Sequence, residues 1–226
     1  MAIVVLLGFG TVVIGGAPAR GHGNEDAGGG DAVWIADGGM MMSLDYQLGI
    51  ALGYIPSEEA LTAAMGDPWH EEPEVKVQRV IKLVHKHDPT LADRATKLYQ
   101  RFHQIAKYLP GPIAPIADED LEQPLAAGQD LVQAARWELD PAGSVSKWIV
   151  NSTAWQQMDH VEQAGLILHE IFYVLHVSDF HSAGRDGLRT RQVRRFVATV
   201  STPWTAHCTD AEFSQLLKDV DLFAVP

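Results

Sequence analysis

The stretch Ala164-Gly-Leu-Ile-Leu-His-Glu-Ile-Phe-Tyr-Val-Leu-His-Val177 decides how this chain is interpreted, because it is helix-like and almost unbroken in apolar character. It places two polar, ionisable residues, His169 and Glu170, side by side within that run. Burying such groups costs free energy unless they are hydrogen-bonded or paired. The stretch therefore predicts a central helix that carries a polar cluster inside the fold.

The His-Glu pair resembles half of the helix of zinc peptidases that carry the His-Glu-x-x-His motif. That motif needs two histidines four residues apart, so that both imidazoles reach one ion. Here Tyr173 stands four residues after His169, and the next histidine is His176. Seven helical residues advance about 10.5 Å along the axis, which is too far for two imidazoles to share one zinc ion. The spacing excludes an orthodox peptidase of this type.

The residues that remain on this surface are His169, Glu170 and Tyr173. An unpaired carboxylate among apolar side chains has a raised pKa or requires a cation. One interpretation is a buried pair between Glu170 and an arginine, which locks the last two helices together. The other is that burial tunes Glu170 as a general acid or base beside His169 and Tyr173. The cations available for the pair are Arg185, Arg189, Arg191, Arg194 and Arg195.

Two further groups of side chains are candidates for binding. The arginine cluster, with Arg191 and Arg194, is suited to a phosphate or a carboxylated glycan, but a solvated helix face or structural pairing is the favoured explanation. The segment from His176 to His181, which we expect to be a loop, also contains Asp179 and has the residue types that chelate a divalent transition metal. No further ligand is indicated by spacing, and no other cofactor is expected.

Composition limits the class of protein. The chain has 226 residues and a formal net charge of −12, which argues against a broad nucleic-acid or anionic-membrane surface. This length suits one domain with a substantial core. The single cysteine, Cys208, excludes an intramolecular disulfide framework and a cysteine-based zinc site.

The N-terminus has the pattern of a signal peptide at residues 1–19. Residues 2–16 are apolar and uncharged, and Ala17-Pro-Ala19 follows as a cleavage site. No Lys or Arg precedes the apolar run, so either the true start lies upstream or the signal is weak. The alternative is a buried strand at Ile3–Leu7 followed by a glycine-rich turn.

After the signal peptide, residues 20–31 are rich in glycine and predict a flexible tether, and residues 32–226 predict a single globular domain. No later segment is long and apolar enough to span a bilayer. We therefore expect a periplasmic or secreted protein without a membrane span in the mature chain.

The fold class expected from the patterns is α+β, mainly helical, with a small antiparallel β element near the central His-Glu helix. Asp159 and Glu162 have the capping-box spacing that begins this helix. Hydrophobic periodicity and turn residues predict the other elements. They are a strand at Val33–Ile35, helices at Ser43–Tyr54, Ser57–Met65, Val75–His87, Thr90–Leu109, Ser152–Met158, Thr190–Ser201 and Asp210–Lys218, and a β-hairpin of Leu131–Leu139 with Val145–Asn151.

The C-terminal half resembles a group of exported bacterial proteins of uncharacterised function, over residues 126–202. The resemblance implies export and directs attention to Gln133, His169, Glu170, Tyr173 and Arg194. It implies no activity. The matching segments are Gln133-Ala-Ala135, Trp148-Ile-Val150, Ala154-Trp155, Gln163-Ala-Gly-Leu-Ile-Leu-His-Glu-Ile-Phe-Tyr173 and Thr190-Arg-Gln-Val-Arg-Arg-Phe-Val197.

The chain departs from the group at two places. Gly128-Gln129 stands where the group has Gly-Cys, which rules out a thiol mechanism borrowed from it, and Arg189-Thr190 stands where the group has Asp-Ser. We expect a non-catalytic module that binds an envelope glycan or a protein partner. The alternatives are a secreted hydrolase that uses Glu170, and a metal-binding protein.

Overall fold

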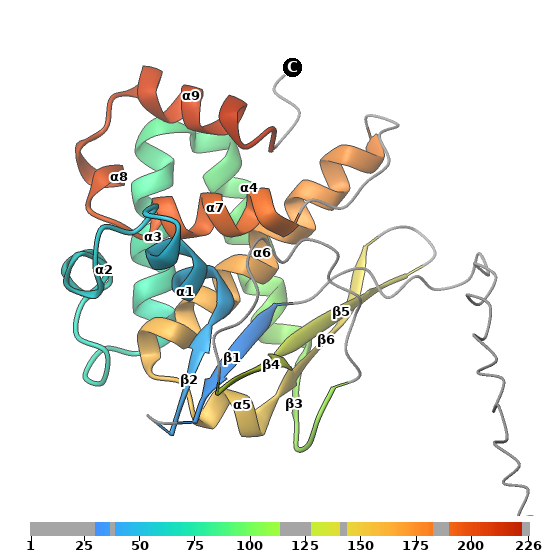
Figure 1. Ribbon diagram of the computed structural model, residues 1–226. Helices are drawn as coiled ribbons and strands as arrows, with labels where there is room; N and C mark the ends of the chain where they lie inside the picture. The colour runs from blue at the N-terminus through green and yellow to red at the C-terminus, as the bar shows by residue number, and fades with distance from the viewer. Residues whose placement is uncertain (1–29, 37–38, 114–127, 141–143, 183–189, 223–226) are drawn as a thin grey trace, which may run out of the picture.

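The computed structural model describes residues 30–36, 39–113, 128–140, 144–182 and 190–222, and the fold is α+β and mainly helical, as expected (Figure 1). Most helices lie at one end of the molecule and the strands gather at the other. The strands are β1 (Asp31–Ile35), β2 (Met40–Ser43), β3 (Ala106–Leu109), β4 (Gln129–Gln133), β5 (Ala135–Leu139) and β6 (Val145–Asn151). The helices are α1 (Leu44–Ala51), α2 (Glu58–Met65), α3 (Pro73–His87), α4 (Pro89–Ile105), α5 (Ser152–Gln156), α6 (His160–Ser182), α7 (Thr190–Val200), α8 (Trp204–His207) and α9 (Asp210–Asp219).

Helix α6 is the centre of the fold, which confirms the prediction from its apolar run. Every residue from Val161 to Val177 is buried, and α1, α3, α4, α7, β2 and β5 pack around it. Asp159 caps its N-terminus by accepting the backbone N–H groups of Val161 at 2.8 Å and Glu162 at 2.9 Å. The capping box was also expected to join the Glu162 side chain to the backbone N–H of Asp159. That prediction is wrong, because the Glu162 carboxylate accepts the N–H of Ser43 at 2.7 Å instead.

The hairpin of α3 and α4 covers α6 and was expected from the periodicity of both helices. Asp88 begins α4 by accepting the N–H of Leu91 at 2.9 Å. The prediction that this helix continues to Leu109 is wrong, because the chain becomes β3 at Ala106 and pairs with β6. Pro110 disfavours helical backbone in the residue before it, and pairing with β6 supplies the hydrogen bonds that the helix would have made.

The strands form two three-stranded sheets rather than one small element. The first has the order β2-β1-β4 and is antiparallel. The second has the order β3-β6-β5, with β3 parallel and β5 antiparallel to β6. The predicted hairpin is confirmed for β5 and β6, but its first strand is divided at Ala134. The division follows from Gly30, whose carbonyl accepts the N–H groups of both Ala134 and Ala135 at 3.0 Å.

Gly30 and Asp31, the last two residues of the predicted tether, are buried in the fold, and the Gly30 N–H donates to Glu170. Residues 1–29, which contain the predicted signal peptide, its alternative strand at Ile3–Leu7 and most of the predicted tether, lie outside the described residues. Among the described helices, none is both long enough and apolar enough to cross a membrane.

Candidate functional site

Glu170 lies at the middle of α6 and is 0% exposed. One carboxylate oxygen accepts the backbone N–H of Gly30, and the other accepts the indole N–H of Trp148 at 3.0 Å. No arginine contacts this carboxylate within the described part of the chain. The prediction of a Glu170–arginine pair is therefore wrong for Arg191, Arg194 and Arg195, because the backbone N–H of Gly30 and the indole of Trp148 donate to this carboxylate instead. Arg185 and Arg189 lie outside the described residues.

Burial raises the pKa of Glu170 to about 7, and the nearby His169 charge and the two N–H donors limit that rise. An uncharged carboxylic acid is easier to bury than a carboxylate. Glu170 consequently changes protonation near neutral pH, although it is enclosed on all sides.

Arg194 was one of the arginines expected to pair with Glu170, but it pairs with Asp31 and Asp45 instead. Its guanidinium lies 3.1 Å from the Asp31 carboxylate and 3.7 Å from that of Asp45, and the residue is only 3% exposed. Asp31 opens β1 and Asp45 lies in the first turn of α1, so Arg194 joins α7 to both elements.

His169 completes this arrangement from α6. Its Nδ1 lies 2.9 Å and 3.0 Å from the two Asp45 oxygens, and its ring lies beside that of Tyr173, with centroids 5.6 Å apart. Burial alone would lower the pKa of His169, but the charge and hydrogen bond of Asp45, together with the charge of Glu170, raise it above its ordinary value. We call Asp31, Asp45, His169, Glu170 and Arg194 the buried cluster.

Tyr173 and Gln133, which were also expected near this cluster, are both buried and contact other parts of the fold. Tyr173 is 1% exposed and its ring packs edge-on to that of Trp137, with centroids 6.0 Å apart. Gln133 is buried at the end of β4, where its side-chain amide donates to the carbonyls of Gly30 at 3.2 Å and Ala135 at 2.8 Å. Gln133 therefore holds the backbone that covers Glu170, and its predicted role in binding stays a prediction.

Four participants were missed by the sequence patterns: Gly30, Asp31, Asp45 and Trp148. Asp45 is 124 residues from His169 and Asp31 is 163 residues from Arg194. No spacing rule connects positions so far apart. The one available signal was the acidic Asp45 between the apolar Leu44 and the aromatic Tyr46, because a carboxylate requires a partner when it is buried.

The segment from His176 to His181 does not form the loop that was expected, because α6 continues to Ser182. His176 is buried, and Asp179 forms a two-pronged ion pair with Arg94 of α4, with one contact at 3.0 Å. The side chain of His181 lies outside the described residues. Among those described, no group of three or more His, Cys, Asp or Glu side chains is arranged to hold a metal ion. Metal binding through His176, Asp179 and His181 stays a prediction.

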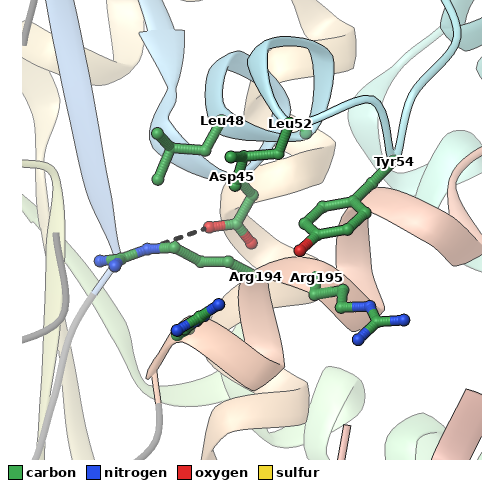
Figure 2. A pocket seen from close by; sticks show the side chains of 8 residues that line it. Asp45, Leu48, Leu52, Tyr54, Arg194 and Arg195 are labelled. Carbon is green, nitrogen blue, oxygen red and sulfur yellow. Dashed lines mark ion pairs between the residues drawn. The ribbon is translucent and has the colours of Figure 1, made fainter. Parts of the chain in front are cut away.

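A pocket lies between α1 and α7, on the outer side of the Asp45–Arg194 pair (Figure 2). Figure 2 shows Asp45 and Arg194 pointing toward each other, with Tyr54 and Arg195 beside them. The empty volume is about 260 Å³, open mouth included. We call it the arginine pocket, and its lining residues are Asp45, Leu48, Gly49, Leu52, Tyr54, Arg191, Arg194 and Arg195.

Comparison with models of protein families, with curated proteins and with solved structures finds no match to this chain. The resemblance of residues 126–202 to exported bacterial proteins stays a prediction. The chemistry of the site therefore rests on its own geometry.

Proposed function

We propose that the protein is an exported, non-catalytic module that binds an envelope glycan or a protein partner, and that the buried cluster is a structural lock. The burial of Glu170 carries this proposal, since it is 0% exposed and both of its oxygens accept N–H groups from Gly30 and Trp148. A general acid or base has to reach the proton that it transfers. A carboxylate enclosed in this way has no contact with a substrate.

The lock joins segments that are far apart in the chain. Glu170 holds the Gly30 backbone, His169 holds Asp45 of α1, and Arg194 of α7 holds Asp31 and Asp45. These contacts form only when β1, α1 and α7 are all packed on α6. Removing one member of a buried charged group leaves the others uncompensated, which strongly destabilises a fold.

The substitution Glu170→Gln tests the lock. A glutamine can accept one of the two N–H groups, but its own NH₂ group then faces the other donor. We expect a loss of about 1–3 kcal/mol in the free energy of unfolding, measured by urea denaturation. The matched control is Glu74→Gln, at a partly exposed position in the first turn of α3, which should cost about 0.5 kcal/mol through the helix dipole alone. An unchanged stability in Glu170→Gln would contradict the structural role.

Export is supported by the apolar N-terminal run and by Ala17-Pro-Ala19. Expression of the full chain in a Gram-negative host, followed by fractionation and N-terminal sequencing, tests it. We expect a periplasmic or secreted product that begins close to residue 20. An uncleaved chain confined to the cytosol would count against export.

A second function, a secreted hydrolase that uses Glu170, is favoured by two observations. The pKa of Glu170 is about 7, which suits a general acid or base. In addition, Nε2 of the buried His169 has no hydrogen-bond partner among the described residues. This function requires the Gly30 segment to move away from Glu170. It predicts that Glu170→Gln abolishes hydrolysis of chromogenic glycosides or peptides while changing the melting temperature by no more than about 2 °C.

A further inference from the structure

We propose that an extended peptide of a protein partner binds at the junction of β4 and β5, with a glycine against Glu170, and that Gly30 and Asp31 occupy this site as an inhibitory strap. The inference rests on the proposed binding of a protein partner and names that partner as a glycine-containing peptide segment. We call the surroundings of Gly30 the glycine site, and its members are Gln133, Ala134, Ala135, Leu166 and Glu170.

The glycine site binds both backbone polar groups of Gly30. The N–H donates to the Glu170 carboxylate. The carbonyl oxygen accepts the backbone N–H groups of Ala134 and Ala135, each at 3.0 Å, and the side-chain amide of Gln133 at 3.2 Å. A carbonyl oxygen has two lone pairs, so the site supplies as many donors as a peptide carbonyl can use. None of these hydrogen bonds involves a side chain of the strap, and the backbone of another extended peptide can therefore make them.

The glycine site has no room for a side chain. A Cβ atom on Gly30 would overlap a methyl group of Leu166 and would lie 2.9 Å from a Glu170 oxygen. Leu166 is buried, so the surrounding core limits how far its methyl group can move. Peptides that bind by adding a strand gain affinity from backbone hydrogen bonds and specificity from the space left for each side chain. The site should therefore accept an extended peptide with glycine at this position and reject alanine.

The strap leaves one polar atom beside the glycine site unsatisfied. Nδ1 of His169 lies 2.9 Å from Asp45, while its buried Nε2 has no hydrogen-bond partner among the described residues. The ring carbon bonded to Nε2, Cδ2, lies 3.6 Å from where a Cβ on Gly30 would stand. Gly30 therefore covers this edge of the ring without bonding to it. A buried polar atom without a partner costs free energy, so a peptide that reaches Nε2 gains a hydrogen bond that the strap does not make.

The strap is held by groups that titrate. The ionisable groups around Glu170 are His169 of α6, Asp45 of α1, and the Asp31–Arg194 pair of β1 and α7. Burial raises the pKa of Glu170 to about 7, and exposure in the open state returns it toward its ordinary 4.5. A rise from pH 6 to pH 8 should therefore increase the open fraction about tenfold. The raised pKa of His169 acts in the same direction, because its proton also favours the closed state.

The experiment is an NMR titration of the ¹⁵N-labelled full chain with acetyl-Gly-Gly-Asp-Ala-amide, which copies residues 29–32, and with the same peptide carrying alanine as its second residue. The probe is the Trp148 indole N–H, which donates to Glu170 at 3.0 Å. Asp31→Asn removes the ion pair that holds the strap, and its matched control, Asp130→Asn, removes the same charge from an exposed position on β4. We expect Asp31→Asn to bind the glycine peptide about tenfold more tightly than Asp130→Asn or the native chain, because more of it is open. The alanine peptide should bind none of the three proteins.

Hydrogen exchange in the native chain tests the strap without a ligand and without a substitution that could unfold the protein. The amides of Ala134 and Ala135 donate to Gly30, whereas the Asn151 amide donates to the Ala134 carbonyl and reports on the adjoining sheet. After correction for intrinsic rates, exchange at Ala134 and Ala135 should rise about tenfold from pH 6 to pH 8, and exchange at Asn151 should stay constant.

Three results would overturn the inference: no saturable shift of the Trp148 indole with the glycine peptide, equal binding of the alanine peptide, or exchange at Ala134 and Ala135 that changes with pH only as Asn151 does. None of these results bears on the lock. If Glu170→Gln destabilises the fold while the glycine peptide does not bind, the inference fails and the structural role of the buried cluster stands.

Discussion

The buried cluster and the arginine pocket share the Asp45–Arg194 pair, yet the two sides of that pair differ in what they can do. On the inner side, Glu170 is enclosed by Gly30 and Trp148 and every charge is answered by a neighbour a few ångströms away. On the outer side, Arg191 and Arg195 border open space. The same residue types therefore pair with buried charges on one side of the Asp45–Arg194 pair and line a pocket on the other.

The largest expected effect is that of Arg194→Ala, which removes the cation common to both regions. It leaves the buried Asp31 and Asp45 carboxylates without their guanidinium, and we expect a loss of about 3–5 kcal/mol in the free energy of unfolding by urea denaturation. Arg94→Ala, which removes the partly exposed partner of Asp179, is the control and should cost at most about 1 kcal/mol. Similar losses in both variants would erase the distinction between buried and exposed pairs.

The next effect is a dependence of stability on pH that comes from Glu170 in the buried cluster. The ordinary pKa of Glu170 is 4.5 and its folded value is about 7, so between these values the folded state holds a proton that the unfolded chain has released. The contribution of Glu170 to the free energy of unfolding is therefore fully present below pH 4.5 and falls by about 3 kcal/mol as the pH rises past 7.

Two neighbours act in the same direction. Burial raises the pKa of Glu162, whose contribution is likewise lost as pH rises. The raised pKa of His169 gives stability that is present below pH 6.5 and is lost above its folded value. Urea midpoints at pH 5 and pH 8 measure the effect, and Glu170→Gln should show a clearly smaller change than the native chain. An identical pH dependence in the two proteins would show that Glu170 does not titrate near neutrality.

A smaller effect is expected from Gly30→Ala, which tests how closely the N-terminal segment covers Glu170. A Cβ atom at this position would lie 2.4 Å from a Leu166 methyl and 2.9 Å from a Glu170 oxygen. Relieving that overlap should cost about 1–3 kcal/mol. Hydrogen exchange should also show faster opening of β1, and unchanged stability together with unchanged exchange would show that Gly30 does not cover Glu170 closely.

The smallest expected effect on stability is that of Arg195→Gln. This side chain is only partly buried and packs on Tyr54 without a carboxylate partner among the described residues. We expect a change of about 0.5 kcal/mol or less in urea denaturation. A loss comparable to that of Arg194→Ala would make Arg195 part of the lock and would break the contrast between the two regions.

Several elements could be predicted from the sequence because the interactions that form them are local. The apolar run of α6, the Asp159 cap at its start and the periodicity of α7 each depend on residues within a few positions of one another. The turn at Asp140 gave the β5–β6 hairpin for the same reason. His169, Glu170 and Tyr173 were also correctly expected to lie inside the fold, whereas the periodicity of α7 placed Arg194 on the face opposite the core, and it is buried.

Only the tertiary structure decided which charges meet. Arg194 forms ion pairs with Asp31 and Asp45 and not with Glu170. Glu170 accepts the backbone N–H of Gly30, where an arginine was expected. Ala106–Leu109 became a strand because β6 lies beside it, although its own periodicity continued a helix. The physical reason is the same in each case. A buried polar group pairs with whatever donor or acceptor the packing brings to it. When the two residues are more than a hundred positions apart, no local sequence pattern predicts their contact.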